Sequence, residues 1–169
     1  MNERGSFYLA HSVPSPLEVV GGEFDSEFFF VCEHAGRTIP KCLGDLGVDR
    51  SEMDRHIAYD VGAEAVSRRL ASALCAPLYV QPYSRLVIDC NRPFEAADCI
   101  PEVSDGTEIP RNVALTPEER TLRFENIHRP FHEAISDGLD RVQARGRKAL
   151  LLTIHSFTPI MRNGRGARV

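Results

Sequence analysis

The stretch of sequence that decides the fold lies late in the chain and reads Ala149-Leu150-Leu151-Leu152-Thr153-Ile154-His155-Ser156-Phe157-Thr158-Pro159. Its first six residues are apolar or β-branched without a break. Such a run is typical of a strand buried on both faces in the middle of a parallel sheet. The run ends on His155, and ligands of open α/β sheets bind beyond the carboxyl ends of strands. We therefore expect His155 to lie at a functional site.

Two other stretches have the same form, an apolar run followed directly by polar residues. Residues 27–32 read EFFFVC and are followed by Glu33 and His34. Residues 85–89 read RLVID and are followed by the segment 90–93, which reads CNRP. Both runs are predicted to be buried strands. Because each predicted strand delivers polar residues at its end, together they predict one shared site.

The segments between these runs predict helices, one further strand and a long loop. Residues 51–58 and 62–76 are predicted to be helices, and residues 78–81 a strand. A helical face of residues 62–76 is formed by Ala65, Val66, Leu70 and Leu74. Residues 90–115 have a polar composition without periodicity, and a loop of that length is usually functional.

A long helix is predicted from Thr116 to about Gly146. The segment Thr116-Pro117-Glu118-Glu119 combines an N-cap, a proline at the first helical position and a capping-box glutamate. The resulting order of elements predicts a single α/β domain over residues 1–169, with a mixed or mostly parallel sheet flanked by helices.

The composition excludes several classes of protein. Apolar residues make up 43% of the chain and charged residues 26%, as in ordinary globular proteins. The net charge of −4 argues against binding to nucleic acid or an anionic membrane. The five cysteines form no CxxC pair, and no segment resembles a signal peptide or a membrane helix. We expect reduced thiols and a cytoplasmic protein.

A metal site is predicted at the strand ends. His34 and His155 each follow an apolar run, and Glu33 precedes His34. Two imidazoles and one carboxylate match a catalytic zinc site whose fourth position is left for water. Taken singly, each histidine is more readily explained by a structural hydrogen bond than by metal binding. Asp60 is a second candidate carboxylate, although an N-cap for the following helix explains it locally.

A polar cluster follows residues 85–89. Arg85 and Arg92 present planar guanidinium groups that could bind the carboxylate of an acidic substrate in two parallel hydrogen bonds. An internal ion pair between an arginine and Asp89 explains the same residues equally well. Asn91 lies within this cluster.

Other histidines and one serine are weaker candidates. His128 and His132 have the i, i+4 spacing of helical metal ligands, but no glutamate follows the first, so a place on the core-facing side of the helix is favoured. Ser156 adjoins His155, and neighbours on a strand point to opposite faces, so a serine–histidine dyad is not expected.

Taken together, these motifs resemble the N-formylglutamate amidohydrolase family. The matching residues are Glu33-His34-Ala35-Gly36 with Ile39-Pro40, His56, Asp60 with Gly62-Ala63, the segment from Arg85 to Pro93, and His155-Ser156-Phe157-Thr158-Pro159. The segment Asp89 to Arg92 and the pair His155-Ser156 are similar, more distantly, to elements of zinc carboxypeptidases and aspartoacylases.

The resemblance implies a phosphorylase/hydrolase-like α/β fold and zinc-dependent hydrolysis of N-formyl-L-glutamate, or a similar small acidic N-acyl amino acid, to formate and glutamate. It implies that His34 and His155 hold zinc, with Glu33 or Asp60 as the carboxylate ligand. Arg92 and Asn91 would polarise the scissile carbonyl, and Arg85, Arg92 and Ser156 would bind substrate.

The resemblance leaves two points open. The family continues beyond the His155-Ser156 element to a late glutamate that would act as general base, so we expect residues 1–169 to lack a C-terminal part and to show little activity alone. Apolar surface left open in that way would favour homo-oligomers, as a hypothesis. The alternatives are a non-catalytic module that binds a carboxylate ligand and a peptidase-like hydrolase of another substrate.

Overall fold

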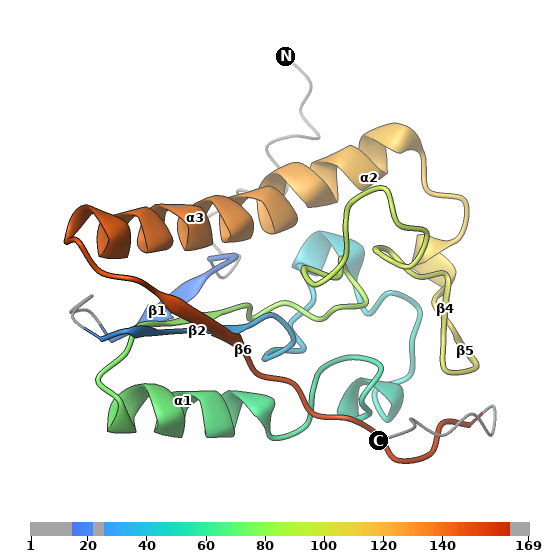
Figure 1. Ribbon diagram of the computed structural model, residues 1–169. Helices are drawn as coiled ribbons and strands as arrows, with labels where there is room; N and C mark the ends of the chain where they lie inside the picture. The colour runs from blue at the N-terminus through green and yellow to red at the C-terminus, as the bar shows by residue number, and fades with distance from the viewer. Residues whose placement is uncertain (1–14, 22–25, 163–169) are drawn as a thin grey trace.

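The chain folds into a four-stranded sheet between two helical layers, as seen in the computed structural model, which describes residues 15–21 and 26–162 (Figure 1). In sheet order, the strands are β1 (Glu18–Val20), β3 (Leu78–Val80), β2 (Phe28–Cys32) and β6 (Leu150–Thr153). β2 pairs in parallel with both β3 and β6, and β1 pairs antiparallel with β3. This mostly parallel, mixed sheet confirms the expected α/β fold.

Helices cover the two faces of the sheet. α1 (Ala63–Ala73) lies on one face, and α3 (Arg129–Ala144) lies on the other (Figure 1). α2 (Pro117–Arg123) and a π-helical turn, η4 (Phe124–His128), lead into α3 without a break. The predicted long helix is therefore confirmed, with one widened turn.

The predicted capping box starts this helix. The Thr116 hydroxyl accepts a hydrogen bond from the Glu119 amide at 3.2 Å, and the Glu119 carboxylate accepts one from the Thr116 amide at 3.0 Å. Two amide groups near the helix start thereby gain partners that the helix itself cannot supply.

β2 is buried on both faces. Phe29 stacks on Tyr79 with ring centroids 4.8 Å apart, in the cluster that includes Phe131 of α3. Phe30 lies in a second cluster, on the α1 side of the sheet. α3 approaches the sheet so closely that a Cβ on Gly138 would lie 2.5 Å from the Tyr79 hydroxyl. Glycine is required there because no larger side chain fits.

Residues 51–58 do not form the predicted helix. Only a 3₁₀ turn, η2 (Glu52–Asp54), is present, and the backbone turns extended at Arg55, where ψ is 163°. Arg55 contacts Asp105 at 2.6 Å and the Thr107 hydroxyl at 2.9 Å. These contacts tie the segment to the hairpin of β4 (Val103–Ser104) and β5 (Thr107–Glu108), so tertiary contacts override the local helix signal.

Residues 86–89 are buried as predicted and Arg85 is partly exposed, but residues 85–89 form turns and irregular backbone, so the predicted strand is wrong. Side chains, rather than a neighbouring strand, satisfy the buried carbonyl groups. Asn112 donates to the Leu86 carbonyl at 2.9 Å, and the guanidinium of Arg123 donates to the Val87 carbonyl at 2.9 Å. η3 (Pro110–Asn112) places Asn112 for this contact, and η1 (Lys41–Leu43) completes the short helical turns.

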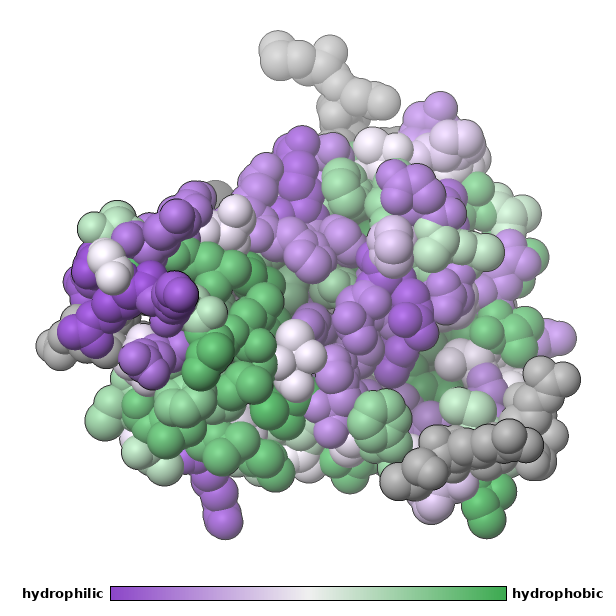
Figure 2. Space-filling view, viewed as in Figure 1, coloured by the Kyte–Doolittle hydropathy of each residue, from purple (hydrophilic) through white to green (hydrophobic). Residues whose placement is uncertain are grey.

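Two apolar surfaces are exposed where burial was expected. β6 lies at the edge of the sheet and all its residues are exposed, so the prediction of a strand buried on both faces is wrong. α1 packs through the small residues Ala63, Ser67 and Ala71 instead of its larger apolar face. Figure 2 shows a broad hydrophobic area over β6 and α1. Exposed apolar residues of these elements are Val66, Leu70, Leu150, Leu151 and Leu152.

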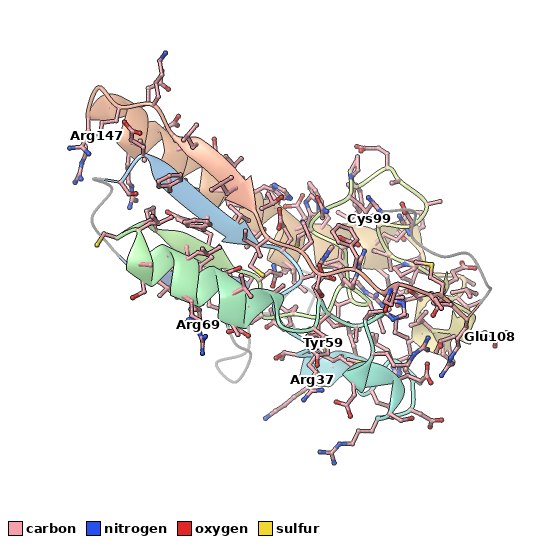
Figure 3. All side chains as sticks on the ribbon, turned by 60° about the horizontal axis from the view of Figure 1, so that its bottom comes forward. Arg37, Tyr59, Arg69, Cys99, Glu108 and Arg147 are labelled. Atoms are coloured by element: carbon pink, nitrogen blue, oxygen red, sulfur yellow. The ribbon has the colours of Figure 1, made fainter. Side chains whose placement is uncertain are left out.

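Three further features complete the fold. All five cysteines are free of disulfides. Within residues 15–21 and 26–162, no helix is both long enough and apolar enough to cross a membrane. Arg147 lies at the opposite end of the molecule from Glu108 (Figure 3), in the basic segment that follows α3.

Candidate functional site

His34 reaches the site because β2 ends just before it. Its side chain is only 2% exposed. Beyond His34 the chain approaches residues 81–82 closely, since the Gly36 amide donates to the Gln81 carbonyl at 3.0 Å. A Cβ on Gly36 would lie 1.8 Å from the Pro82 carbonyl oxygen, so this approach requires glycine. The turn holds His34 at the carboxyl end of the sheet.

Asp60 reaches the same place from the turn before α1. Its amide donates to the His34 carbonyl at 2.9 Å, which joins the two segments through the backbone. Gly62 follows in a left-handed conformation (φ 81°), and the chain then enters α1. The Asp60 side chain is buried and makes no cap to the helix, so its carboxylate is directed elsewhere.

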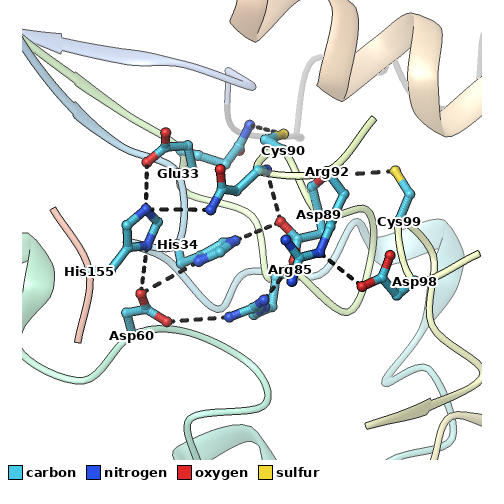
Figure 4. Close-up of polar contacts among 12 residues, drawn as sticks. Glu33, His34, Asp60, Arg85, Asp89, Cys90, Arg92, Asp98, Cys99 and His155 are labelled. Atoms are coloured by element: carbon cyan, nitrogen blue, oxygen red, sulfur yellow. Dashed lines mark hydrogen bonds and ion pairs between the residues drawn. The ribbon is translucent and has the colours of Figure 1, made fainter. Parts of the chain in front are cut away.

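That carboxylate contacts both strand-end histidines (Figure 4). Asp60 Oδ2 lies 2.9 Å from His155 Nδ1 and 3.5 Å from His34 Nδ1. The two imidazole rings have centroids 5.1 Å apart. One ligand atom from each of these three residues lies within 4.8 Å of the others. Strands β2 and β6 and the turn before α1 thus bring together two imidazoles and one carboxylate.

This group of residues fits a metal ion. His34 Nδ1 is buried and has no hydrogen-bond partner in the described part of the chain. A buried nitrogen without a partner is costly unless some other group occupies its lone pair. Two histidines and one carboxylate are a donor set that zinc prefers in catalytic sites.

Asp89 orients His34 from the other side. His34 Nε2 lies 2.6 Å from Asp89 Oδ1, and an ionised carboxylate can only accept a hydrogen bond, so Nε2 carries the proton. Nδ1 then has a free lone pair that faces Asp60. Hydrogen bonds of this kind commonly fix the tautomer of a metal-binding histidine.

The charges of the site are strongly coupled. Burial alone would raise the pKa of Asp89, but the hydrogen bond from His34 and the nearby Arg85 lower it to about 2. Burial likewise opposes ionisation of Asp60, yet contacts with His155 and His34 hold its pKa well below the usual range. Burial lowers the pKa of His34, but the carboxylates of Asp60 and Asp89 beside its ring raise it by more.

Glu33 lies on the opposite side of His155 from Asp60. Its Oε2 is 3.6 Å from His155 Nε2, is buried, and has no hydrogen-bond partner among the described residues. Asp60 contacts both histidines, whereas Glu33 approaches only His155. The geometry therefore places Asp60 in the three-residue group and leaves Glu33 beside it.

The two arginines have different surroundings. Arg85 bridges two carboxylates, with Asp89 at 2.7 Å and Asp60 at 3.4 Å. It matches the internal ion pair that the sequence left as an alternative. Arg92 pairs through Nε with the exposed Asp98 at 2.9 Å, and its side chain is 43% exposed. Arg92 therefore has surface available for a ligand.

Asn91 and Ser156 also lie at the site. The Asn91 side-chain amide is 3.5 Å from His155 Nε2, and the Ser156 amide donates to Asp60 Oδ2 at 3.3 Å. Ser156 thus contributes its backbone to the group, and the contact supports the position of Asp60.

Sequence reasoning missed two contributions. Asp89 was considered only as a partner of arginine, although its position at the end of a buried run was the available signal. His128 is buried, as a core-facing place predicts, whereas His132 is more exposed. The contacts of His128 and His132 with the carbonyl groups of Arg92 and Cys90, at 2.9 and 2.8 Å, are the contribution that the sequence did not predict. Their i, i+4 spacing was the available signal, because it places both rings on one side of the helix.

The chain is similar to a protein of known structure and to one protein family. The crystal structure of gene product Atu2144 from Agrobacterium tumefaciens is similar, with 37% sequence identity and a TM-score of 0.86. The match covers 100% of this chain and 64% of that chain, so this chain spans somewhat less than two thirds of its length. No curated protein matches significantly. The sequence model of N-formylglutamate amidohydrolases matches residues 26–169, and the chain therefore belongs to the N-formylglutamate amidohydrolase family.

Proposed function

We propose that this chain forms the zinc-binding part of an amidohydrolase that cleaves N-formyl-L-glutamate, or a similar small acidic N-acyl amino acid, to formate and glutamate. The observation that carries the proposal is the group of His34, Asp60 and His155, in which His34 Nδ1 is buried without a partner. Membership of the family supports the reaction class.

The charge balance of the site also favours a divalent cation. Glu33, Asp60 and Asp89 are all buried, and Arg85 is the cation that contacts two of them. Buried charges of one sign are costly unless paired, so a positive ion between these groups would stabilise the folded site.

His34, Asp60 and His155 would hold the metal. When bound, zinc polarises a carbonyl group and lowers the pKa of water toward neutrality. Asp89 keeps the proton of His34 on Nε2 and so leaves Nδ1 as the ligand atom. Arg85 bridges Asp60 and Asp89 and adds to the contacts with the histidines that keep both carboxylates ionised.

Substrate orientation would come from the segment after residue 89. Arg92 is the arginine of this segment with an exposed side chain, and a guanidinium group binds a carboxylate in a planar, two-bond arrangement. We assign binding of the substrate carboxylate to Arg92, where it would replace Asp98 as the partner of the guanidinium group. Asn91, beside His155, would donate a hydrogen bond to the oxygen of the reacting carbonyl.

Metal content tests the proposal most directly. We expect about one zinc per chain in the wild type and little in His155→Ala, because the variant removes one of three ligands. His56→Ala is the matched control, since His56 contacts Asp105 at 3.4 Å and is not in the metal-ligating group. Zinc retained in His155→Ala, or none in the wild type, would contradict the assignment.

Substrate binding and its dependence on zinc separate the enzyme from its rival, because residues 1–169 alone are expected to release little formate. N-formyl-L-glutamate binding, measured by calorimetry, should weaken in Arg92→Ala and after zinc is removed. Binding that needs no zinc would favour the non-catalytic carboxylate-binding module. Equal affinity for other N-acyl amino acids would assign a broader substrate class.

A further inference from the structure

A pair of histidines contacts the segment that carries Asn91 and Arg92. His128 Nε2 lies 2.9 Å from the Arg92 carbonyl oxygen, and His132 Nε2 lies 2.8 Å from the Cys90 carbonyl oxygen. The two carbonyls flank Asn91 on either side. Neither histidine belongs to the group of His34, Asp60 and His155.

The direction of these hydrogen bonds follows from the acceptors. A carbonyl oxygen cannot donate, so each histidine must carry its proton on Nε2. His128 Nδ1 is buried and has no hydrogen-bond partner in the described residues, so a second proton there would be unsatisfied. Burial lowers the pKa of His128, and its contact with the Arg92 carbonyl only partly offsets this. The neutral Nε2–H tautomer satisfies these constraints.

The helix is shaped to present both rings. The Arg129 amide bonds to the Phe124 carbonyl, five residues back, which makes the π-helical turn before α3. Pro130 has no amide proton for a regular helical bond at the next position. The His128 ring, in the turn, and the His132 ring, in α3, have centroids 4.5 Å apart and are tilted by 36°. Single π-turns of this kind occur frequently at functional sites.

The rest of the segment is held at its start. The Asp89 amide donates to the Cys99 carbonyl at 2.7 Å, and Asp89 accepts from the Asn91 amide at 2.8 Å. The Gln81 side chain contacts the Cys90 sulfur at 3.4 Å. The carbonyl groups of Cys90 and Arg92 lie on the other side of the segment. His132 donates a hydrogen bond to the first and His128 to the second.

We propose that His128 and His132 are positioning residues that hold the Cys90 and Arg92 carbonyls and thereby aim Asn91 and Arg92 at the site. The consequence for substrate rests on the proposed function, whereas the structural part stands independently of it. Without this pair of histidines, the segment would still be held at Asp89. Its backbone from Cys90 onward would no longer be fixed in position.

Glutamine and leucine variants separate hydrogen bonding from packing. The Nε2 of glutamine can donate from nearly the same position as Nε2 of histidine, whereas leucine fills space and donates nothing. In His132→Leu and His128→Leu, we expect amide hydrogen exchange at Asn91 and Arg92 to be roughly three- to tenfold faster, as for one lost hydrogen bond. In His132→Gln and His128→Gln, exchange should stay near the wild-type rate.

The control is Ile135→Ala, which removes buried apolar contacts of α3 and leaves both histidine donors in place. The exchange rates at Asn91 and Arg92 are divided by those of core amides in β2, which corrects for any change in global stability. Ile135→Ala should leave this ratio unchanged. Nitrogen-15 NMR of the imidazoles should show Nε2–H at both histidines. Equal exchange in the leucine and glutamine variants, or Nδ1–H tautomers, would overturn the proposal.

These measurements need neither substrate nor metal. Their failure would refute the positioning role and leave the zinc assay of His155→Ala to decide the proposed function. Conversely, loss of N-formyl-L-glutamate binding in His132→Leu, with recovery in His132→Gln, is the result expected when both proposals hold. If His132→Leu binds N-formyl-L-glutamate with unchanged affinity, the proposal that this histidine positions Arg92 for substrate binding would be contradicted.

Discussion

β2 and β6 are neighbouring parallel strands with similar apolar sequences, but their environments differ sharply. Phe29 and Leu151 are partners in register, so their side chains lie on the same face of the sheet. Phe29 is fully buried, whereas Leu151 is 48% exposed. The difference arises because β2 has strands on both sides and β6 lies at the edge.

The same difference appears in the histidines that follow the strands. His34, after β2, is buried and has carboxylates on both ring nitrogens, Asp60 and Asp89. His155, after β6, is half-buried and keeps one nitrogen near Asn91 and Glu33. One histidine of the candidate metal site is thus held by the core, and the other lies at an open edge of the sheet.

The largest expected effect compares the two partners in register. Phe29→Ala should lower the free energy of unfolding by about 3–5 kcal/mol, because it opens a cavity between the sheet and α3. Leu151→Ala should cost at most about 1 kcal/mol, since half of that side chain is already in water. Urea unfolding of both variants measures the difference, and equal losses would show that β6 is buried in solution.

A smaller effect on the free energy of unfolding should appear at acidic pH, and it arises from Asp89, the partner of His34. The pKa of Asp89 falls from 3.8 to about 2 on folding, so its carboxylate stabilises the fold above about pH 4. That stability is lost as the pH falls toward about 2, and amounts to roughly 2 kcal/mol.

Asp89→Asn supplies the matched variant, because the amide oxygen can still accept from His34. Unfolding of the metal-free protein at pH 6 and pH 2.5 should show a smaller acid-induced loss in Asp89→Asn than in the wild type. An identical pH dependence in both proteins would mean that Asp89 is not held ionised by His34 and Arg85.

The smallest expected change in stability concerns the exposed surface of β6. Leu151→Lys places a charge on an edge strand, where lysine commonly prevents pairing with other chains. We expect the unfolding free energy to change by less than about 1 kcal/mol and binding of a hydrophobic dye to fall. The same substitution at Phe29 should prevent folding, because an unpaired charge would be buried.

The positions of most elements could be predicted from local sequence, and the exceptions share one cause. β2, β3, β6, α1 and the long helix appear where periodicity, caps and prolines indicated them. Residues 51–58 differ because the Arg55 side chain binds the distant hairpin of β4 and β5. Residues 85–89 differ because side chains distant in sequence, such as Arg123, satisfy their carbonyl groups. A local sequence pattern does not reveal partners that are distant in the chain.

The sequence by itself determined the α/β class, the strand ends that carry His34 and His155, and the family motifs, because each depends on residues close together in the chain. The tertiary structure alone decided which carboxylate meets both histidines and which apolar strand is buried. It also decided that Asp89 orients His34, and that His128 and His132 hold the segment carrying Asn91 and Arg92. Each of these depends on contacts between residues far apart in sequence, which only the packed fold brings together.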